Sequence, residues 1–221
     1  MLPNQTLLAF PVGRGGKRKG AGRKPAGERA GVKHASRARV TPHQPVFVTT
    51  KVIEGLPSLR SAEEAKVVLQ AFREVNALRV IRIVQYSIQS NHLHLIVEAR
   101  NAAQLSRGMS QLTIRIARRL NKLWGRKGKL WKERFHSRVI DSRAQMRNVL
   151  RYCLNNGHKH GVWHDHSQPD PLSSARWFEG CVGYRAEARD AACPVALARS
   201  WLASIGWRKK AQLPAASSPA A

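Results

Sequence analysis

The segment "HLHLIVEA", residues 92–99, restricts the possible folds more than any other part of this 221-residue chain. Its aliphatic and β-branched residues predict a strand, in which side chains two positions apart point to the same side. Leu93 and Leu95 therefore face one side of the sheet, and His92 and His94 face the other. The pattern predicts a sheet with one face packed under helices and two imidazoles held on the opposite face.

The surrounding sequence supplies three more strands and three helices. Their hydrophobic patterns occur in this order: a strand from Pro45, a helix at 61–78, strands at 79–88 and 92–99, a helix at 105–123, a strand at 134–140 and a helix at 142–156. Possible capping boxes, "SAEE" and "SRAQ", open the first and the last helix. The order β-α-β-β-α-β predicts an α+β fold of the ferredoxin-like, split βαβ type. We expect an antiparallel four-stranded sheet with helices on one face, plus a C-terminal helix that carries Tyr152.

The net charge of +26 indicates a polyanionic partner, of which nucleic acid is the commonest. An anionic membrane surface is the competing partner. The sequence, however, shows no basic amphipathic helix with a broad aromatic face and no apolar run that could span a bilayer. Cys153, Cys181 and Cys193 form no CxxC pair, which suits a reducing compartment. We therefore expect a cytoplasmic protein that binds nucleic acid and no membrane.

Composition divides the chain into three parts. Residues 1–42 are rich in Arg, Lys and Gly and poor in large apolar residues, which predicts a disordered basic arm. Its "GRKP" segment is either a minor-groove contact or a generic solvated charge run. Residues 43–160 contain the predicted strands and helices and form the expected folded domain. Residues 161–221 form a Trp-rich extension with a frayed tail, in which 194–207 has the pattern of one short helix that packs its tryptophans onto the domain.

Two imidazoles on one rigid strand can form half of a metal site, although a His-x-His pair alone is weak support for metal binding. The same spacing recurs at 158–160 and 164–166, in a loop that fixes no geometry, and we interpret those histidines as solvated. Glu98, on the same face as the histidine pair, is either a group that supports the metal ligands or, as we expect, a solvated acid.

Tyr152 and Asn156 lie four residues apart on the last predicted helix and therefore share one face of it. A tyrosine hydroxyl and an amide oxygen presented together can act as a nucleophile and a third metal ligand. The ordinary alternative for Tyr152 is a half-buried packing residue with a solvated hydroxyl.

The segments "NHLHLIVE", "LWKERFHSRVI" and "RYCLNNGHKHG", with an Arg-rich helix after the first, occur in an order and spacing that resemble the IS200-like single-tyrosine transposases. These enzymes are HUH nucleases and include the REP-associated tyrosine transposases. The resemblance covers roughly residues 44–160 and implies that the domain at 43–160 is the catalytic domain. It implies that His92 and His94 are the HUH metal ligands, that Tyr152 is the nucleophile and that Asn156 is the third ligand.

The resemblance also implies an activity. The chain would be a transposase and endonuclease that cleaves single-stranded or hairpin DNA and rejoins it through a 5′-phosphotyrosine, in the bacterial nucleoid. Related enzymes occur as monomers and as dimers, so a homodimer is one expectation. The family uses Mg²⁺ or Mn²⁺, whereas two imidazoles and an amide oxygen by themselves suit Zn²⁺ or Mn²⁺. We expect Mg²⁺ or Mn²⁺.

The helix at 105–123 and the loop after it carry many cations and one acid, so we expect them to follow DNA phosphates. The predicted DNA-binding residues are Arg115, Arg118, Arg119, Lys122, Arg126, Lys127, Lys129, Trp131, Lys132 and Arg134. Trp131 would stack on an unpaired base, and its alternative is a role in core packing.

A different class of protein also fits the charge. A non-catalytic or domesticated nucleic-acid-binding protein of ferredoxin-like fold would be equally basic, but it would leave the two histidines, the tyrosine and the asparagine unconnected. Sheets of that kind that bind RNA carry aromatic residues on their central strands, where this chain has His92 and His94. The sequence therefore favours the enzyme.

Overall fold

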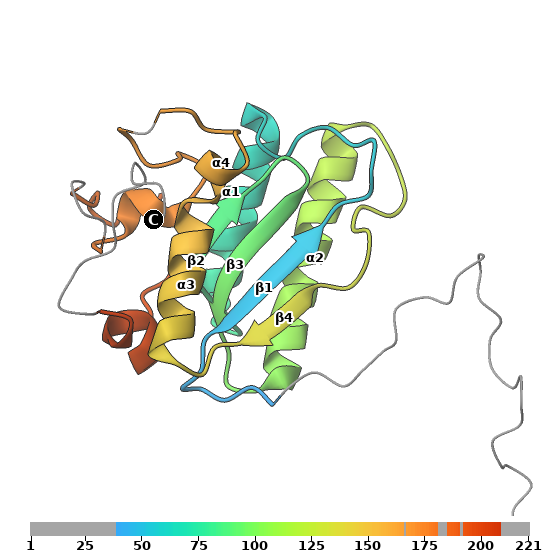
Figure 1. Ribbon diagram of the computed structural model, residues 1–221. Helices are drawn as coiled ribbons and strands as arrows, with labels where there is room; N and C mark the ends of the chain where they lie inside the picture. Colours follow the sequence, from blue (N-terminus) through green and yellow to red (C-terminus); the bar gives the residue numbers. More distant parts are fainter. Residues whose placement is uncertain (1–38, 166, 181–184, 191, 209–221) are drawn as a thin grey trace, which may run out of the picture. The chain divides into compact units, whose positions relative to one another are not determined.

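A computed structural model describes residues 39–165, 167–180, 185–190 and 192–208, and its strands form one antiparallel sheet (Figure 1). The strands are β1 (Val46–Lys51), β2 (Arg82–Ile88), β3 (His92–Glu98) and β4 (His136–Val139). The helices are α1 (Ala62–Ala77), α2 (Ala102–Leu123), α3 (Arg143–Leu154) and the short α4 (Asn156–Lys159), with single helical turns at Ser174–Trp177 and Leu202–Gly206.

The strand order is β2-β3-β1-β4, as the predicted ferredoxin-like arrangement requires. The histidine strand β3 is therefore central and pairs with a neighbour on each side. Thr49 of β1 and Ser87 of β2 both lie opposite His94, and Lys51 lies opposite His92. The predicted four-stranded antiparallel sheet is confirmed.

One face of this sheet is apolar and covered by α1 and α2. Leu93 and Leu95 point into this layer, together with Phe72 of α1 and Leu112 of α2, and all four are fully buried. Gly108 lets α2 approach the entry to β2 closely, because a Cβ at that position would overlap the side chain of Ile81. This layer is the larger of the two cores.

The opposite face carries the histidines and is covered only in part. In Figure 1, α3 lies in front of β2 and β3, whereas the described residues leave the front of β1 and β4 open. Ile96 of β3 packs under α3 with Met146, Leu150 and Cys153, which forms a second, smaller core. Helices therefore lie on both faces, and α3, the helix that contains Tyr152, is the one on the histidine face.

The two predicted capping boxes have different outcomes. Ser142 forms the N-cap half of one, because its side chain accepts a hydrogen bond from the backbone N–H of Gln145 at 3.2 Å. The Gln145 side chain in turn accepts from the N–H of Asp141. Ser61 occupies the N-cap of α1, but its side chain makes no capping hydrogen bond, so that prediction is wrong. Two glutamates in the first turn of α1 provide the favourable interaction with the helix dipole instead.

The prediction of one helix at 194–207 is wrong, because only Leu202–Gly206 forms a helical turn. Trp207 packs onto the domain and is buried, whereas Trp201 is 53% exposed.

The prediction that Glu98 is a solvated acid is also wrong. Its buried carboxylate accepts hydrogen bonds from the backbone N–H groups of Arg199 and Ser200 and pairs with Arg82 at 2.9 Å. This carboxylate ties the extension to the end of β3, since a buried charge is stable only when its hydrogen bonds are satisfied.

The predicted basic arm falls outside the described residues except for its last four positions. Within the described part of the chain, the helices are all too short or too polar to cross a bilayer.

Candidate functional site

Strand β3 brings the two histidine rings together on the partly covered face. Because residues two apart share a face, His92 and His94 lie side by side, with ring centroids 4.6 Å apart. Their Nε2 atoms are only 2.9 Å apart. Two ring nitrogens at that distance must share a proton or a cation, because two bare lone pairs would repel each other.

Each ring is oriented by a partner on its other nitrogen. The Nδ1 atom of His92 lies 2.8 Å from the side-chain oxygen of Asn91, and Nδ1 of His94 lies 3.1 Å from the Thr49 hydroxyl. Phe47 of β1 also stacks on the His94 ring, at 5.4 Å between centroids. Metal-binding histidines are commonly held by such a contact to the second nitrogen, which fixes the ring and leaves Nε2 for the metal.

The phenol of Tyr152 reaches the same point from α3. Its oxygen lies 3.5 Å from Nε2 of His94, and its ring meets the Phe47 ring edge to face. The Lys159 ammonium lies 5.1 Å from the centre of the Tyr152 ring. Burial raises the pKa of the Tyr152 phenol above its ordinary value, so the hydroxyl is protonated at neutral pH.

Both histidines are neutral at pH 7. Burial, together with the neighbouring imidazoles, lowers the pKa of His94 to about 3. Burial, followed by the effect of His160, lowers the pKa of His92 to about 4. A neutral imidazole is the form that can donate a lone pair to a metal ion, so the site is prepared for a cation without the loss of protons.

Contrary to the prediction from the sequence, Asn156 does not lie on the same helix as Tyr152. Helix α3 ends at Leu154, Asn155 interrupts it, and Asn156 begins α4. The Asn156 side chain is fully buried, and neither its oxygen nor its nitrogen has a hydrogen-bond partner among the described residues. It is not among the residues that line the cavity beside the histidines. A buried amide without a partner is costly, which is consistent with an absent ligand.

These donors fit a divalent cation by their chemistry. Two neutral imidazoles with convergent Nε2 atoms and an amide oxygen without a partner are all suitable ligands for such an ion. In the described part of the chain, no cluster of three or more His, Cys, Asp and Glu side chains has the arrangement of a metal site. A metal site here would therefore depend on the amide or on further ligands from the DNA and water.

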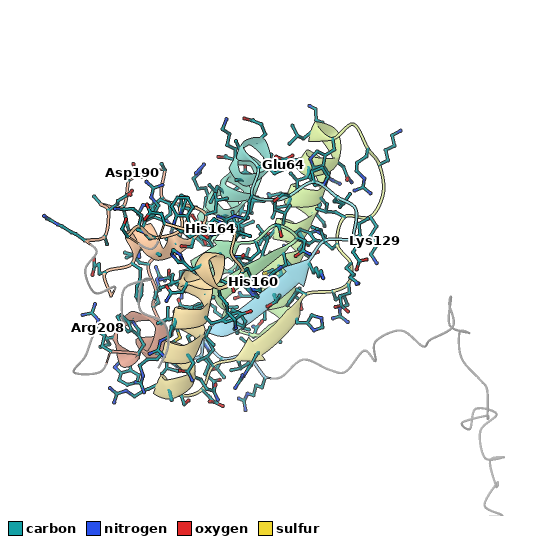
Figure 2. All side chains as sticks on the ribbon, turned by 45° about the horizontal axis from the view of Figure 1, so that its top comes forward. Glu64, Lys129, His160, His164, Asp190 and Arg208 are labelled. Carbon is teal, nitrogen blue, oxygen red and sulfur yellow. The ribbon has the colours of Figure 1, made fainter. Side chains whose placement is uncertain are left out.

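A cavity of about 490 Å³ opens in front of the histidine pair. It is lined by Thr49, Lys51, Gln89, Ser90, Asn91, His92, His94, Tyr152, His160 and Val162. His160 was interpreted from the sequence as a solvated loop residue, but its ring lies 5.8 Å from that of His92 (Figure 2). Only the tertiary structure reveals this, because 158–160 and 164–166 have the same spacing in the sequence.

A buried ion pair lies behind the cavity lining at Val162, whose carbonyl accepts a hydrogen bond from Arg60 at 3.5 Å. Arg60 binds both carboxylate oxygens of Asp170, at 2.8 and 2.9 Å, and also donates to the carbonyl of Ile88. Gly157, next to Asn156, packs so closely on Asp170 that a Cβ at that position would overlap its carboxylate. The extension thus supports the corner between α3 and α4, a role that the sequence analysis missed because neither residue belongs to a recognisable motif.

The predicted DNA-binding residues of α2 lie on the other side of the sheet from the histidines. Two of them interact with Glu74 of α1: Arg119 at 2.8 Å and Arg115 at 3.6 Å. Arg118 and Lys122 are exposed. These two cations are therefore the ones on α2 that are best placed to meet phosphates.

The loop after α2 returns to the same end of the sheet as the histidines. Trp131 bridges to Val52, and the N–H of Lys132 donates to the carbonyl of Lys51, the residue opposite His92. The other cations of this loop differ in their contacts. Arg126 donates to Asn121 and to a loop carbonyl, Lys129 donates to the Lys132 carbonyl, Lys132 pairs with Glu54, and Lys127 and Arg134 are exposed.

Comparison with known proteins gives the same family as the sequence resemblance. Residues 58–156 match the family model described as "Transposase IS200 like". A solved REP-associated tyrosine transposase bound to a REP hairpin is similar with a TM-score of 0.54 and 18% identity, over 65% of this chain and 83% of that one. A candidate transposase from Deinococcus radiodurans R1 has a TM-score of 0.39 and 15% identity, over 52% of this chain and 95% of that one. No curated protein matches the chain.

Proposed function

We propose, because residues 58–156 match the model of IS200-like transposases, that the chain is a metal-dependent endonuclease and transposase that acts on single-stranded DNA through a 5′-phosphotyrosine. Its catalytic nucleophile would be Tyr152, and its metal ligands would be His92, His94 and Asn156. The expected location is the bacterial cytoplasm, at the nucleoid.

One observation carries this proposal. Three groups meet at one open cavity: the two histidine rings and the phenol of Tyr152. The Nε2 atom of His94 lies 2.9 Å from Nε2 of His92 and 3.5 Å from the phenol oxygen. A tyrosine that only fills space would not need to bring its hydroxyl to the point where the two histidine nitrogens converge. The three groups come from one chain, so a homodimer, which remains a prediction, is not needed to complete the site.

The proposed step conserves every atom of the DNA. The oxygen of Tyr152 attacks a backbone phosphorus in line with the 3′ oxygen, which leaves and receives a proton. The products are a 5′-phosphotyrosine and a free 3′-hydroxyl, and attack by a 3′-hydroxyl on the phosphotyrosine reverses the reaction. Since the pKa of the phenol is raised, the proton must pass to a base as the new bond forms.

Mg²⁺ or Mn²⁺, the ions that the family resemblance implies, is the proposed metal. When bound by His92, His94 and Asn156, it would neutralise charge on the scissile phosphate. The contacts at Nδ1 of each histidine fix both rings, so that their Nε2 atoms converge on one point beside the cavity. Lys51, which lines the cavity, supplies a further positive charge for the phosphate.

Single-stranded or hairpin DNA is the proposed substrate. The similar REP-associated transposase is bound to a REP hairpin. In this chain, the cavity at Tyr152 lies next to the basic loop around Lys132, which could follow a phosphate backbone away from the cleavage point. Figure 2 labels Lys129 on the same loop, at the edge of the domain.

The test uses a pool of random hairpin oligonucleotides, labelled at either the 5′ or the 3′ end and incubated with protein and Mn²⁺. Denaturing electrophoresis should show a covalent protein–DNA band that carries the 3′ label and not the 5′ label. Tyr152→Phe and chelator should both abolish the band, whereas the control Tyr184→Phe should retain it. DNA binding without any covalent band would contradict the proposal and leave the non-catalytic alternative.

A further inference from the structure

The pairing between β1 and the chain that enters β4 is interrupted next to the histidine site. Thr49 pairs with His136, and the next contact joins the Lys51 carbonyl to the N–H of Lys132. One residue of β1, Thr50, therefore lies opposite three residues, 133–135. An insertion of this kind is a β-bulge, and bulges are frequent beside active sites because they redirect side chains.

The bulge opens a second cavity, of about 260 Å³, on the opposite face of β1 from the histidines. It is lined by Thr50, Ser106, Ser110, Thr113, Trp131, Glu133, Arg134 and Phe135. The Thr50 side chain is only 3% exposed, and its hydroxyl has no hydrogen-bond partner among the described residues. Buried hydroxyls are normally hydrogen-bonded, so this one indicates a ligand with a donor or acceptor of its own.

The chemistry of the lining fits a flat, polar-edged ring. Trp131 is held rigidly because its indole N–H donates to the carbonyl of Thr113 at 2.9 Å. The Thr113 hydroxyl donates to the Met109 carbonyl, which leaves its lone pairs free to accept. An aromatic platform beside several hydroxyl groups can stack on a ring and hydrogen-bond its edge. The volume is below the roughly 300–1,000 Å³ of pockets for drug-sized ligands, so a single small ring suits it better.

The second cavity and the proposed catalytic centre are reached by neighbouring residues of β1. Thr49 contacts His94 on one face of β1, and Thr50 lines the second cavity on the other. Lys51 lines the first cavity, and its carbonyl is bound by Lys132, the neighbour of Trp131. A DNA strand that crosses the bulge could therefore place a phosphate at one site and a nearby base at the other.

We propose that this second cavity holds one unpaired nucleobase of the DNA strand and that the Thr50 hydroxyl recognises its edge. The inference rests on the proposed function for its substrate class, but its test uses binding alone. The base would stack on Trp131 or Phe135, and the hydroxyl of Thr50 would favour one base over the others at that position.

The first measurement locates the base. Tyr152→Phe protein, which should bind without cleavage, is irradiated with single-stranded oligonucleotides in which thymine is replaced by 5-iodouracil, a base that cross-links to nearby aromatic side chains. Peptide mass spectrometry should find the cross-link at Trp131 or Phe135. Cross-links confined to other aromatic residues would overturn the proposal.

The second measurement tests recognition. Selection from a random single-stranded pool with Tyr152→Phe protein should enrich one base at one position, and adding Thr50→Val should remove that preference. Adding Trp131→Ala should weaken binding of the selected sequence about tenfold, within the range for loss of one stacked base. Trp201→Ala, a change at an exposed indole of the extension, should leave affinity unchanged. An unaltered base preference in Thr50→Val would overturn the inference, whether or not wild-type protein forms the covalent adduct.

Discussion

The two faces of the central sheet have opposite characters although the same strands build both. On the face under α1 and α2, Leu93 and Leu95 are fully buried in an apolar layer. On the face under α3, the same strand presents His92, His94 and Glu98, each with a polar partner. The comparison teaches that one face provides most of the stability and leaves the other free to carry groups that would be costly in an ordinary core.

The largest expected effect is on the activity of the histidine face. His94→Gln should reduce formation of the covalent DNA adduct by more than about 100-fold. Loss of a residue that only orients a metal ligand costs up to about 100-fold, and loss of a proposed ligand should cost more. The change in unfolding free energy should be smaller than that of any apolar truncation on the other face. Adduct yield and urea denaturation measure the two quantities, with His164→Gln as the control at an exposed histidine. A large loss of stability with normal activity would reverse the roles assigned to the faces.

A change at Leu95, the neighbour of His94, should lower stability and leave activity intact. Leu95→Ala removes a fully buried side chain from the α1 and α2 layer, which should lower the free energy of unfolding by about 3 kcal/mol. The folded fraction of this variant should retain its adduct-forming activity per molecule. Urea denaturation combined with active-site titration at low temperature checks both expectations, and loss of specific activity in fully folded protein would count against the division.

Glu98 tests whether the polar face also has a structural part. Glu98→Gln keeps the shape but removes the charge that pairs with Arg82 and receives the N–H groups of Arg199 and Ser200. We expect a loss of about 2 kcal/mol, below the usual cost of breaking a fully buried pair because Arg82 is partly exposed. Limited proteolysis should cut near 194–208 before the domain unfolds. Cleavage that is no faster than in wild type would show that the extension is held by other contacts.

The smallest change should come from lowering the pH by about one unit from neutrality. The pKa values of His92 and His94 are lowered on folding to about 4 and about 3, so the unfolded chain binds protons that the folded protein does not. In metal-free buffer, the free energy of unfolding should be greatest above about pH 6.5 and should decline as pH falls toward 4. The double variant His92→Gln/His94→Gln should show a flatter profile. An equal slope in both proteins would assign the pH dependence to other groups.

Several features were predictable because they depend on local rules. The period of two along a strand placed His92 and His94 on one face, and helical periodicity located α1, α2 and α3. The ends of elements were less accurate. Asn155 interrupts the last predicted helix, and 194–207 contains only a short helical turn, because packing against the sheet decides such details and propensity does not.

Other features were beyond the reach of sequence patterns because they join distant segments. His160 was indistinguishable from the other loop histidines until the structure placed it near His92. The pair of Arg60 and Asp170 joins residues 110 positions apart. Thr50 resembles any β-branched strand residue, and only the structure shows that its hydroxyl lines a cavity and has no partner among the described residues.

The sequence by itself determined the order of the elements, the face of the strand that holds the two imidazoles, and the chemical types available for a phosphodiester reaction, since each follows from short-range periodicity and side-chain chemistry. The tertiary structure alone decided which of those groups meet. Distances between α3, β3, the extension and the bulge depend on how whole layers pack, and that packing is a collective property that no single segment encodes.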